Sequence, residues 1–161
     1  MYRDRIRLPA LHSKVMSAAD AAGLIQDGMT VGMSGFTRAG EASSDLKNIL
    51  KQMGVSPDTV RKVSIAMYEG EINMVIHANG GVITVFVTPK EVTMILKDSG
   101  PGIPDIDKAM QAGYSTAPDN IRSLGFGAGM GLPNMKKYSD DMKIETELGV
   151  GTTVTMTVRI C

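Results

Sequence analysis

The sequence predicts an α/β two-layer sandwich, in which a mixed, mostly antiparallel sheet is covered on one face by helices. Apolar residues recur at helical spacing in two consecutive runs between Gly40 and Gly81. Two β-rich runs, VITVFV and EVTMILKD, follow and are separated only by Thr88-Pro89-Lys90, which predicts an antiparallel hairpin. The chain then closes on two alternating strands joined by Gly149-Val150-Gly151. Their alternation predicts one packed and one solvated face.

Composition narrows the classes of protein that fit. The 161 residues suit one domain, and 17 basic residues balance 17 acidic ones. No basic run is interleaved with aromatic residues, so we expect no nucleic-acid partner. No apolar run is long enough to cross a membrane, and the only cysteine is Cys161, so we expect a cytoplasmic protein. The 13 methionines are expected mainly to fill the core.

Residues 1–35 form a distinct N-terminal segment. Ser17 is expected to cap a helix near residues 18–26, and a strand is expected at 29–33 after the Asp27-Gly28 turn. The segment resembles the start of acetyl-CoA hydrolase and CoA-transferase proteins through its V-G-x-x-G-F pattern at Val31, Gly32, Gly35 and Phe36. Nothing downstream continues this resemblance, so transferase activity is not implied. We expect a composite chain, natural or engineered, whose first segment supplies a helix and an edge strand; residual CoA binding is a weaker alternative.

The first helical run extends from Ala42 to Met53 and stops at Gly54. Pro57 opens the second run, because proline is tolerated in the first turn of a helix, and Asn79-Gly80-Gly81 ends it. Gly70 lies inside this helix at a cost of about 1 kcal/mol relative to alanine. We therefore expect close approach of a ligand or a neighbouring strand at Gly70.

Glu69 and Asn73 are four residues apart on the second helix and share one face. A carboxylate and a carboxamide placed in this way can polarise a hydroxyl and hold a hard divalent cation, although the pair also occurs on ordinary solvated helices. Glu71 faces elsewhere and is interpreted as a surface acid. His77, one turn past Asn73, is interpreted as a histidine near the site rather than a catalyst.

The second strand of the hairpin ends at Asp98, which Gly100 and Gly102 follow. A carboxylate there can accept a hydrogen bond from an adenine amino group, while the glycines allow the base to approach the backbone. A short helix is expected over residues 105–112.

Residues 113–129 are expected to form a long glycine-rich loop, which in a compact domain is usually functional or disordered. The helix that starts near Leu132 has N-terminal amides that favour an anion. Arg122, Ser123 and Lys136 are candidates for contact with such an anion, which the family resemblance described below implies to be a terminal phosphate. A dinucleotide-binding interpretation of the GxGxG pattern lacks a preceding βαβ unit.

In this order, the boxes around Asn73, DSGPGI, GFGAGMGL and GVGTTV resemble the GHKL ATP-binding family. Within it, the chain is most similar to the small anti-sigma-factor and switch-protein serine kinases, from about residue 36 to 161. The resemblance implies the Bergerat ATPase fold and a Mg-ATP site, with Asn73 holding Mg²⁺ and Glu69 orienting or deprotonating the attacking hydroxyl. It implies nucleotide contacts from Asp98, Gly100, Gly102, Gly125, Gly127, Gly129, Gly131, Leu132 and, of the two threonines Thr152 and Thr153, from Thr153.

The resemblance also implies a regulatory protein that phosphorylates a serine or threonine of a protein antagonist. A nucleotide-dependent binding switch for an antagonist or a sigma factor, with little or no turnover, is the alternative. Sensor histidine kinases need a dimerisation module that carries a phospho-accepting histidine. The only histidines of this sequence are His12 and His77, and neither lies in such a module. We therefore do not expect a sensor histidine kinase. A homodimer is expected from the resemblance alone.

Overall fold

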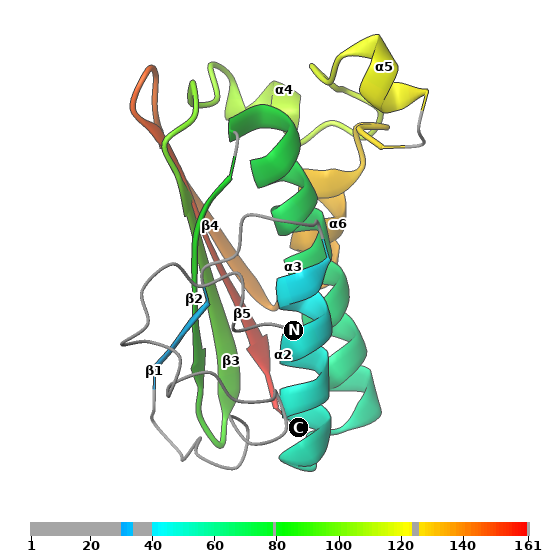
Figure 1. The fold of residues 1–161 in the computed structure, drawn as a ribbon, viewed down its shortest axis with the longest axis vertical. Coiled ribbons are helices and arrows are strands. Elements are labelled where there is room, and N and C mark those ends of the chain that lie inside the picture. Colours follow the sequence, from blue (N-terminus) through cyan, green and yellow to red (C-terminus); the bar gives the residue numbers. More distant parts are fainter. Residues whose placement is uncertain (1–29, 34–39, 79, 124–125, 161) are drawn as a thin grey trace, which may run out of the picture.

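The computed structural model describes the backbone of residues 30–33 and residues 40–160 except 79, 124 and 125 (Figure 1). The helix expected at 18–26 lies outside the described residues. The described elements are, in chain order, β1 (Thr30–Met33), α2 (Glu41–Gln52), α3 (Pro57–Ala78), β2 (Gly81–Val87), β3 (Glu91–Asp98), α4 (Ile106–Ala109), α5 (Asp119–Arg122), α6 (Gly131–Lys137), β4 (Asp141–Glu147) and β5 (Gly151–Arg159).

The strands form one sheet in the order β1-β2-β3-β5-β4, and helices α2, α3 and α6 cover one face of it (Figure 1). The predicted two-layer α/β class is therefore confirmed. Every described strand pair is antiparallel, so the parallel component of a mixed sheet is absent from this part of the chain. β1 is an edge strand, as expected, because it pairs only with β2 among the described strands.

The core lies between the sheet and the helices. Alternate residues of β2, β3 and β5 are buried there, and the intervening residues, several of them threonines, are partly exposed on the other face. Burial of large aliphatic side chains stabilises the fold by roughly 1.5–3 kcal/mol each. Methionines do fill the core, since the buried side chains include Met67, Met74, Met94, Met135 and Met156.

The helices begin and end close to the predicted residues, at Glu41–Gln52 and Pro57–Ala78. Gly70 explains how closely α3 approaches the sheet, because a Cβ at this position would collide with the Leu96 side chain on β3. Of the two reasons expected for this glycine, approach of a ligand or of a neighbouring strand, the structure shows the second. Residues 113–129, expected as a loop, contain the short helix α5.

Glu71 is not a surface acid, and that interpretation was wrong. Its side chain is 7% exposed, and its two carboxylate oxygens accept hydrogen bonds from the backbone N–H groups of Ala42 and Ser43, both at 2.9 Å. These are donors of the first turn of α2, whose own N-cap, Gly40, has no side chain to satisfy them. Glu71 therefore caps α2 from α3 and ties the two helices together.

Substitution of Glu71 by Leu is expected to lower the free energy of unfolding by about 2–4 kcal/mol, because two partly or fully buried N–H groups lose their acceptor. Urea denaturation followed by circular dichroism measures this change. Glu91→Gln is the matched control, since Glu91 is exposed and should change stability by less than about 0.5 kcal/mol. Equal stability of the two variants would show that the cap contributes nothing.

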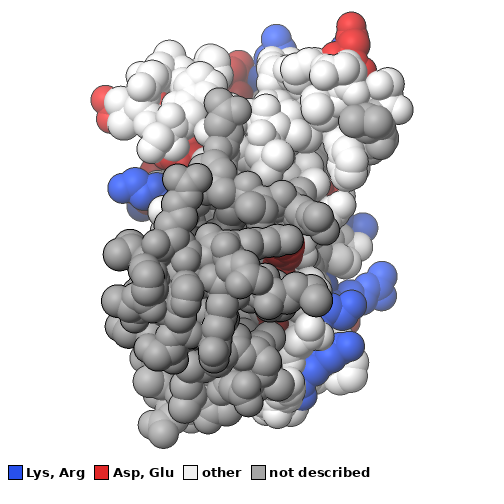
Figure 2. All heavy atoms as spheres, in the orientation of Figure 1, with Lys and Arg blue, Asp and Glu red and all other residues white. Residues whose placement is uncertain are grey.

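On the face shown in Figure 2, the described charged residues are unevenly distributed, although the formal net charge of the sequence is zero. Figure 2 shows Lys and Arg side chains following one another along the helical side of the molecule. Lys47, Lys51 and Arg61 are among the residues that line a hollow of about 400 Å³ between α2 and α3. Among the described residues, no helix combines the length and apolarity that a bilayer crossing requires.

Candidate nucleotide site

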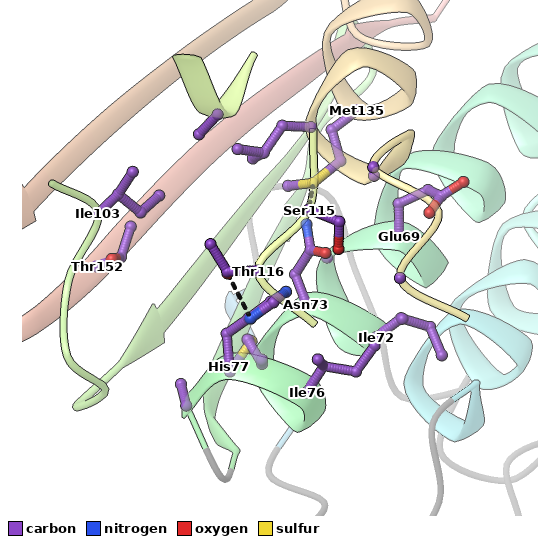
Figure 3. Close-up of a pocket in the computed structure, with 18 of the residues that line it drawn as sticks. Glu69, Ile72, Asn73, Ile76, His77, Ile103, Ser115, Thr116, Met135 and Thr152 are labelled. Atoms are coloured by element: carbon purple, nitrogen blue, oxygen red, sulfur yellow. Dashed lines mark hydrogen bonds between the residues drawn. The ribbon is translucent and has the colours of Figure 1, made fainter. Parts of the chain in front are cut away.

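A cavity of about 870 Å³ opens between α3, the ends of β3 and β5, residues 101–118 and the segment that leads into α6 (Figure 3). This volume lies within the range of small-molecule and cofactor sites. Its walls contain residues that are far apart in the sequence. Most of the predicted site residues can therefore be located relative to this one cavity.

Glu69 and Asn73 both line this cavity from adjacent turns of α3. Glu69 Oε1 accepts a hydrogen bond of 2.7 Å from Asn134 Nδ2, and Asn73 Nδ2 lies 3.5 Å from Met135 Sδ. The first residue of α6 also contacts Asn73, since a Cβ at Gly131 would lie 2.8 Å from Asn73 Oδ1. A larger residue at this position would require the Asn73 side chain to move.

Asp98 lines the cavity at the end of β3. Its Oδ1 accepts hydrogen bonds from the backbone N–H groups of Gly100, at 2.8 Å, and Thr152, at 3.1 Å. Within the described residues Oδ2 has no hydrogen bond, so it is available to a ligand donor. Gly102 lines the cavity with φ of 77°, whereas Gly100 does not line it and packs against Ala78 of α3.

Thr152, not Thr153, lies in the cavity wall. Thr152 is buried and its hydroxyl lies 3.0 Å from that of Thr146 on β4, whereas Thr153 is directed to the other face of β5. The reason is the period of two along a strand, which sends neighbouring residues to opposite faces. The assignment of Thr153 to the site is corrected accordingly.

Gly151, the first residue of β5, allows the start of this strand to lie against the end of β3 at Asp98. Its φ is 144°, and a Cβ there would collide with the backbone oxygen of Asp98. Gly151→Ala is therefore expected to destabilise the fold by roughly 2–4 kcal/mol. Gly149→Ala is the control, because Gly149 has φ of 75° with open space around it and should cost about 1 kcal/mol. Thermal unfolding of both variants measures the difference, and equal losses would contradict the collision.

The segment between α4 and α6 covers one side of the cavity. Gly127, Gly129, Gly131 and Leu132, predicted to contact nucleotide, line the cavity, and Gly125 lies outside the described residues. The segment is tied back by a hydrogen bond of 2.9 Å from the Gly113 N–H to the Gly129 carbonyl. We refer to the described part of this segment, residues 113–123 and 126–130, as the lid.

His77 contacts the lid through Thr116, whose hydroxyl lies 3.5 Å from His77 Nδ1 (Figure 3). The cavity wall removes part of the hydration of the imidazole, and this desolvation lowers the pKa of His77 from its ordinary value. The ring is therefore mainly neutral at pH 7 and can form a hydrogen bond to Thr116 without burying a charge.

Comparison with known proteins identifies the fold. The family model described as the histidine kinase-like ATPase domain matches residues 36–158. The chain belongs to this family. The match begins where the GHKL resemblance was predicted to begin, and residues 1–35 lie outside it.

The relatives within this ATPase family are regulators of sigma factors and kinases. The chain is 36% identical over 104 residues to an "Anti-sigma F factor" of Clostridium acetobutylicum, covering 62% of this chain and 69% of the relative. It is 30% identical over 112 residues to the "Serine/threonine-protein kinase RsbT" of Bacillus subtilis, covering 67% of this chain and 78% of the relative. The chain therefore belongs to the anti-sigma and switch-kinase branch of the family.

A solved structure supports the fold alone. The crystal structure of the RsbU and RsbW domains of Rv1364c from Mycobacterium tuberculosis aligns with a TM-score of 0.56 at 18% identity. The alignment covers 82% of this chain and 32% of that chain.

The residues predicted to contact a terminal phosphate do not line the cavity. Arg122 pairs with Asp119 on α5, and neither Arg122, Ser123 nor Lys136 lines the cavity. The cation that lines it among the described residues is Lys108 of α4, whose Nζ lies 5.0 Å from the centre of the Tyr114 ring. The sequence did not indicate Lys108, because a helix of four residues is too short for a repeating pattern that would show which side faces the cavity.

The donor set fits a magnesium ion that arrives with a nucleotide. Among the described residues, no three His, Cys, Asp or Glu side chains form a cluster able to hold a metal by themselves. Mg²⁺ is commonly held by one or two protein oxygens, with phosphates and water completing its octahedron. Asn73 matches this requirement, since its Nδ2 is directed to Met135 and its Oδ1 has no described hydrogen bond.

Proposed function

We propose that this chain binds Mg-ATP and transfers the γ-phosphoryl group to a serine or threonine hydroxyl of a protein partner, as a partner-switching regulator of the anti-sigma type. One observation carries the proposal. A single cavity holds Asp98, with one carboxylate oxygen available, and on the α3 side the Glu69–Asn73 pair. A ligand that fills it would have a base at one end and phosphates at the other.

The names of the relatives support the choice of reaction within the family. RsbT of Bacillus subtilis carries the name of a serine/threonine-protein kinase, and the Clostridium acetobutylicum relative that of an anti-sigma factor. A chain that shares their ATPase domain is most simply a kinase whose acceptor is another regulatory protein, an antagonist or a sigma factor.

Each residue has a proposed role. Asp98 Oδ2 accepts a hydrogen bond from the adenine amino group, while Thr152 donates to Oδ1 and fixes the carboxylate. Asn73 Oδ1 would hold Mg²⁺, which when bound neutralises charge on the phosphates. Glu69 orients and deprotonates the acceptor hydroxyl, and the lid excludes water from the phosphates. Catalysis is then mainly positioning and charge stabilisation.

A binding switch with little turnover is the second candidate, because the lid presents apolar side chains to solvent. Tyr114, Phe126 and Met130 are 36%, 41% and 41% exposed and also line the cavity. A nucleotide that reorders the lid would change this apolar surface and with it the partner that docks.

We propose that residues 36–161 are the ATP-binding domain and that residues 1–35 are structural, since β1 covers the outer edge of β2. Deletion of residues 1–28 should leave Mg-ATP binding unchanged. Loss of acetyl-CoA binding on deletion would instead reveal a CoA site, and loss of folding would show that residues 1–28 are themselves required for the structure. Sedimentation of the full chain tests whether it is a homodimer.

Calorimetric titration of the purified chain with Mg-ATP, Mg-ADP and acetyl-CoA tests nucleotide binding directly. Single-turnover assays with γ-³²P-ATP then follow label transfer to a library of serine- and threonine-containing peptides and phosphate release to water. Binding with transfer supports the kinase, and binding without any transfer supports the switch. A folded chain that binds no adenine nucleotide refutes both.

A further inference from the structure

Glu69 is held by one residue that the family resemblance did not point to. Asn134 Nδ2 donates to Glu69 Oε1 at 2.7 Å across 65 residues of sequence, in a partly buried contact. A bond to an ionised carboxylate is stronger than one between neutral groups. Glu69 lines the cavity, and its Oε2 has no hydrogen bond within the described residues. One oxygen is thus anchored and the other is left for the acceptor.

Asn134 is itself placed by the packing of α6. Its neighbour Met135 is 1% exposed and contacts Asn73 through its sulfur, while Asn134 contacts Glu69. The Asn134 N–H donates to the Met130 carbonyl at 2.9 Å, which links the turn bearing Asn134 to the last residue of the lid. Consecutive residues of one helix therefore contact both members of the proposed catalytic pair, directly after the lid ends.

We propose that Asn134 is a positioning residue for Glu69: it fixes Oε1 and thereby directs Oε2 toward the acceptor hydroxyl. This inference rests on the proposed kinase function. In the reaction, Oε2 takes the hydroxyl proton as the acceptor oxygen bonds to the γ-phosphorus. The bond from that phosphorus to the β–γ bridging oxygen breaks, and its electron pair leaves with ADP. Asn134 is unchanged, and its contribution is the alignment of the base.

A double-mutant cycle separates this role from simple packing of α6. Asn134→Leu keeps the size of the side chain and removes the donor, and Glu69→Gln removes the base. With Mg-γ-³²P-ATP, Asn134→Leu is expected to lower the single-turnover rate constant of phosphoryl transfer about 10- to 100-fold, because a misplaced base loses its geometry. The calorimetric Kd for Mg-ATP should stay within about twofold. In the Glu69→Gln background the same substitution should have no further effect on the rate.

Two further variants serve as controls for the double-mutant cycle. Asn134→Ala is made alongside, so that the test survives if the branched leucine prevents folding. Lys137→Leu is the matched surface variant, because Lys137 is exposed on the same helix and should leave the rate unchanged.

The outcomes distinguish this inference from the proposed function. An equal loss of rate from Asn134→Leu in the wild-type and Glu69→Gln backgrounds would overturn the positioning role and leave the kinase intact, as would a loss that follows weakened Mg-ATP binding. A wild-type chain that binds Mg-ATP but transfers phosphate to neither peptide nor water would refute the kinase, and the positioning role with it.

Discussion

Replacing Glu69 by Gln is expected to lower the rate constant of phosphoryl transfer about 10²- to 10⁴-fold, the range of general-base catalysis. Glutamine keeps the length of the side chain and one oxygen that can accept the hydrogen bond from Asn134. It cannot accept the proton of the acceptor hydroxyl. Mg-ATP binding should change little, because nucleotide affinity is assigned to other residues of the cavity. Single-turnover transfer from γ-³²P-ATP measures the rate, and calorimetry measures the Kd.

Glu145→Gln is the control for this experiment, because Glu145 is exposed on β4 in an ion pair with Lys143. A Glu69→Gln variant that keeps more than about a tenth of the wild-type rate would exclude Glu69 as an essential base. If the chain is instead a binding switch, Glu69→Gln should leave its affinity for the partner nearly intact. The rate and the partner affinity together therefore decide between the two functions.

The order of the elements could be predicted because each has its own local signal. The period of 3.6 residues and the Gly54 stop define α2, Pro57 starts α3, and two β-rich runs around a three-residue turn define the hairpin. Glu69, Asn73 and Asp98 were also predictable as site candidates, since the spacing on one helix and the end of one strand determine where they lie.

The role of Glu71 could not be predicted from the sequence. The helical period shows that Glu71 faces away from Glu69, but it does not show which part of the protein Glu71 contacts. Its environment depends on how α2 packs against α3. A weak signal existed in Gly40, which precedes α2 without supplying a capping oxygen. A helix start that lacks its own cap is a reason to look for an acceptor elsewhere in the chain.

The choice between Thr152 and Thr153 could have been made from the sequence. Thr152 has the same parity as Val154, Met156 and Val158, the apolar residues of β5, and these are the ones that are buried. Parity along a strand determines the face. By contrast, Lys108 and Asn134 lie on helices of four and seven residues, too short for a pattern to show which side faces the cavity.

Replacing Asp98 by Asn is expected to weaken Mg-ATP binding about 10- to 100-fold, or roughly 1.4–2.7 kcal/mol. The asparagine Oδ1 can still accept from the Gly100 and Thr152 N–H groups, so the turn after β3 and the fold are preserved. The oxygen available to the ligand becomes an NH₂ group. Two donors then face each other where the adenine amino group had an acceptor, and the unpaired donor costs free energy.

Calorimetric titration with Mg-ATP measures this loss, and a thermal melt shows that the variant is folded. Asp107→Asn is the matched control, because Asp107 is exposed on α4 outside the cavity wall and should leave the Kd unchanged. An Asp98→Asn variant with wild-type affinity would mean that Oδ2 does not accept a hydrogen bond from the adenine. Since Oδ1 is already occupied by two backbone amides, the adenine would then have to be recognised from another wall of the cavity, and the site would need to be reoriented around Lys108 and the lid.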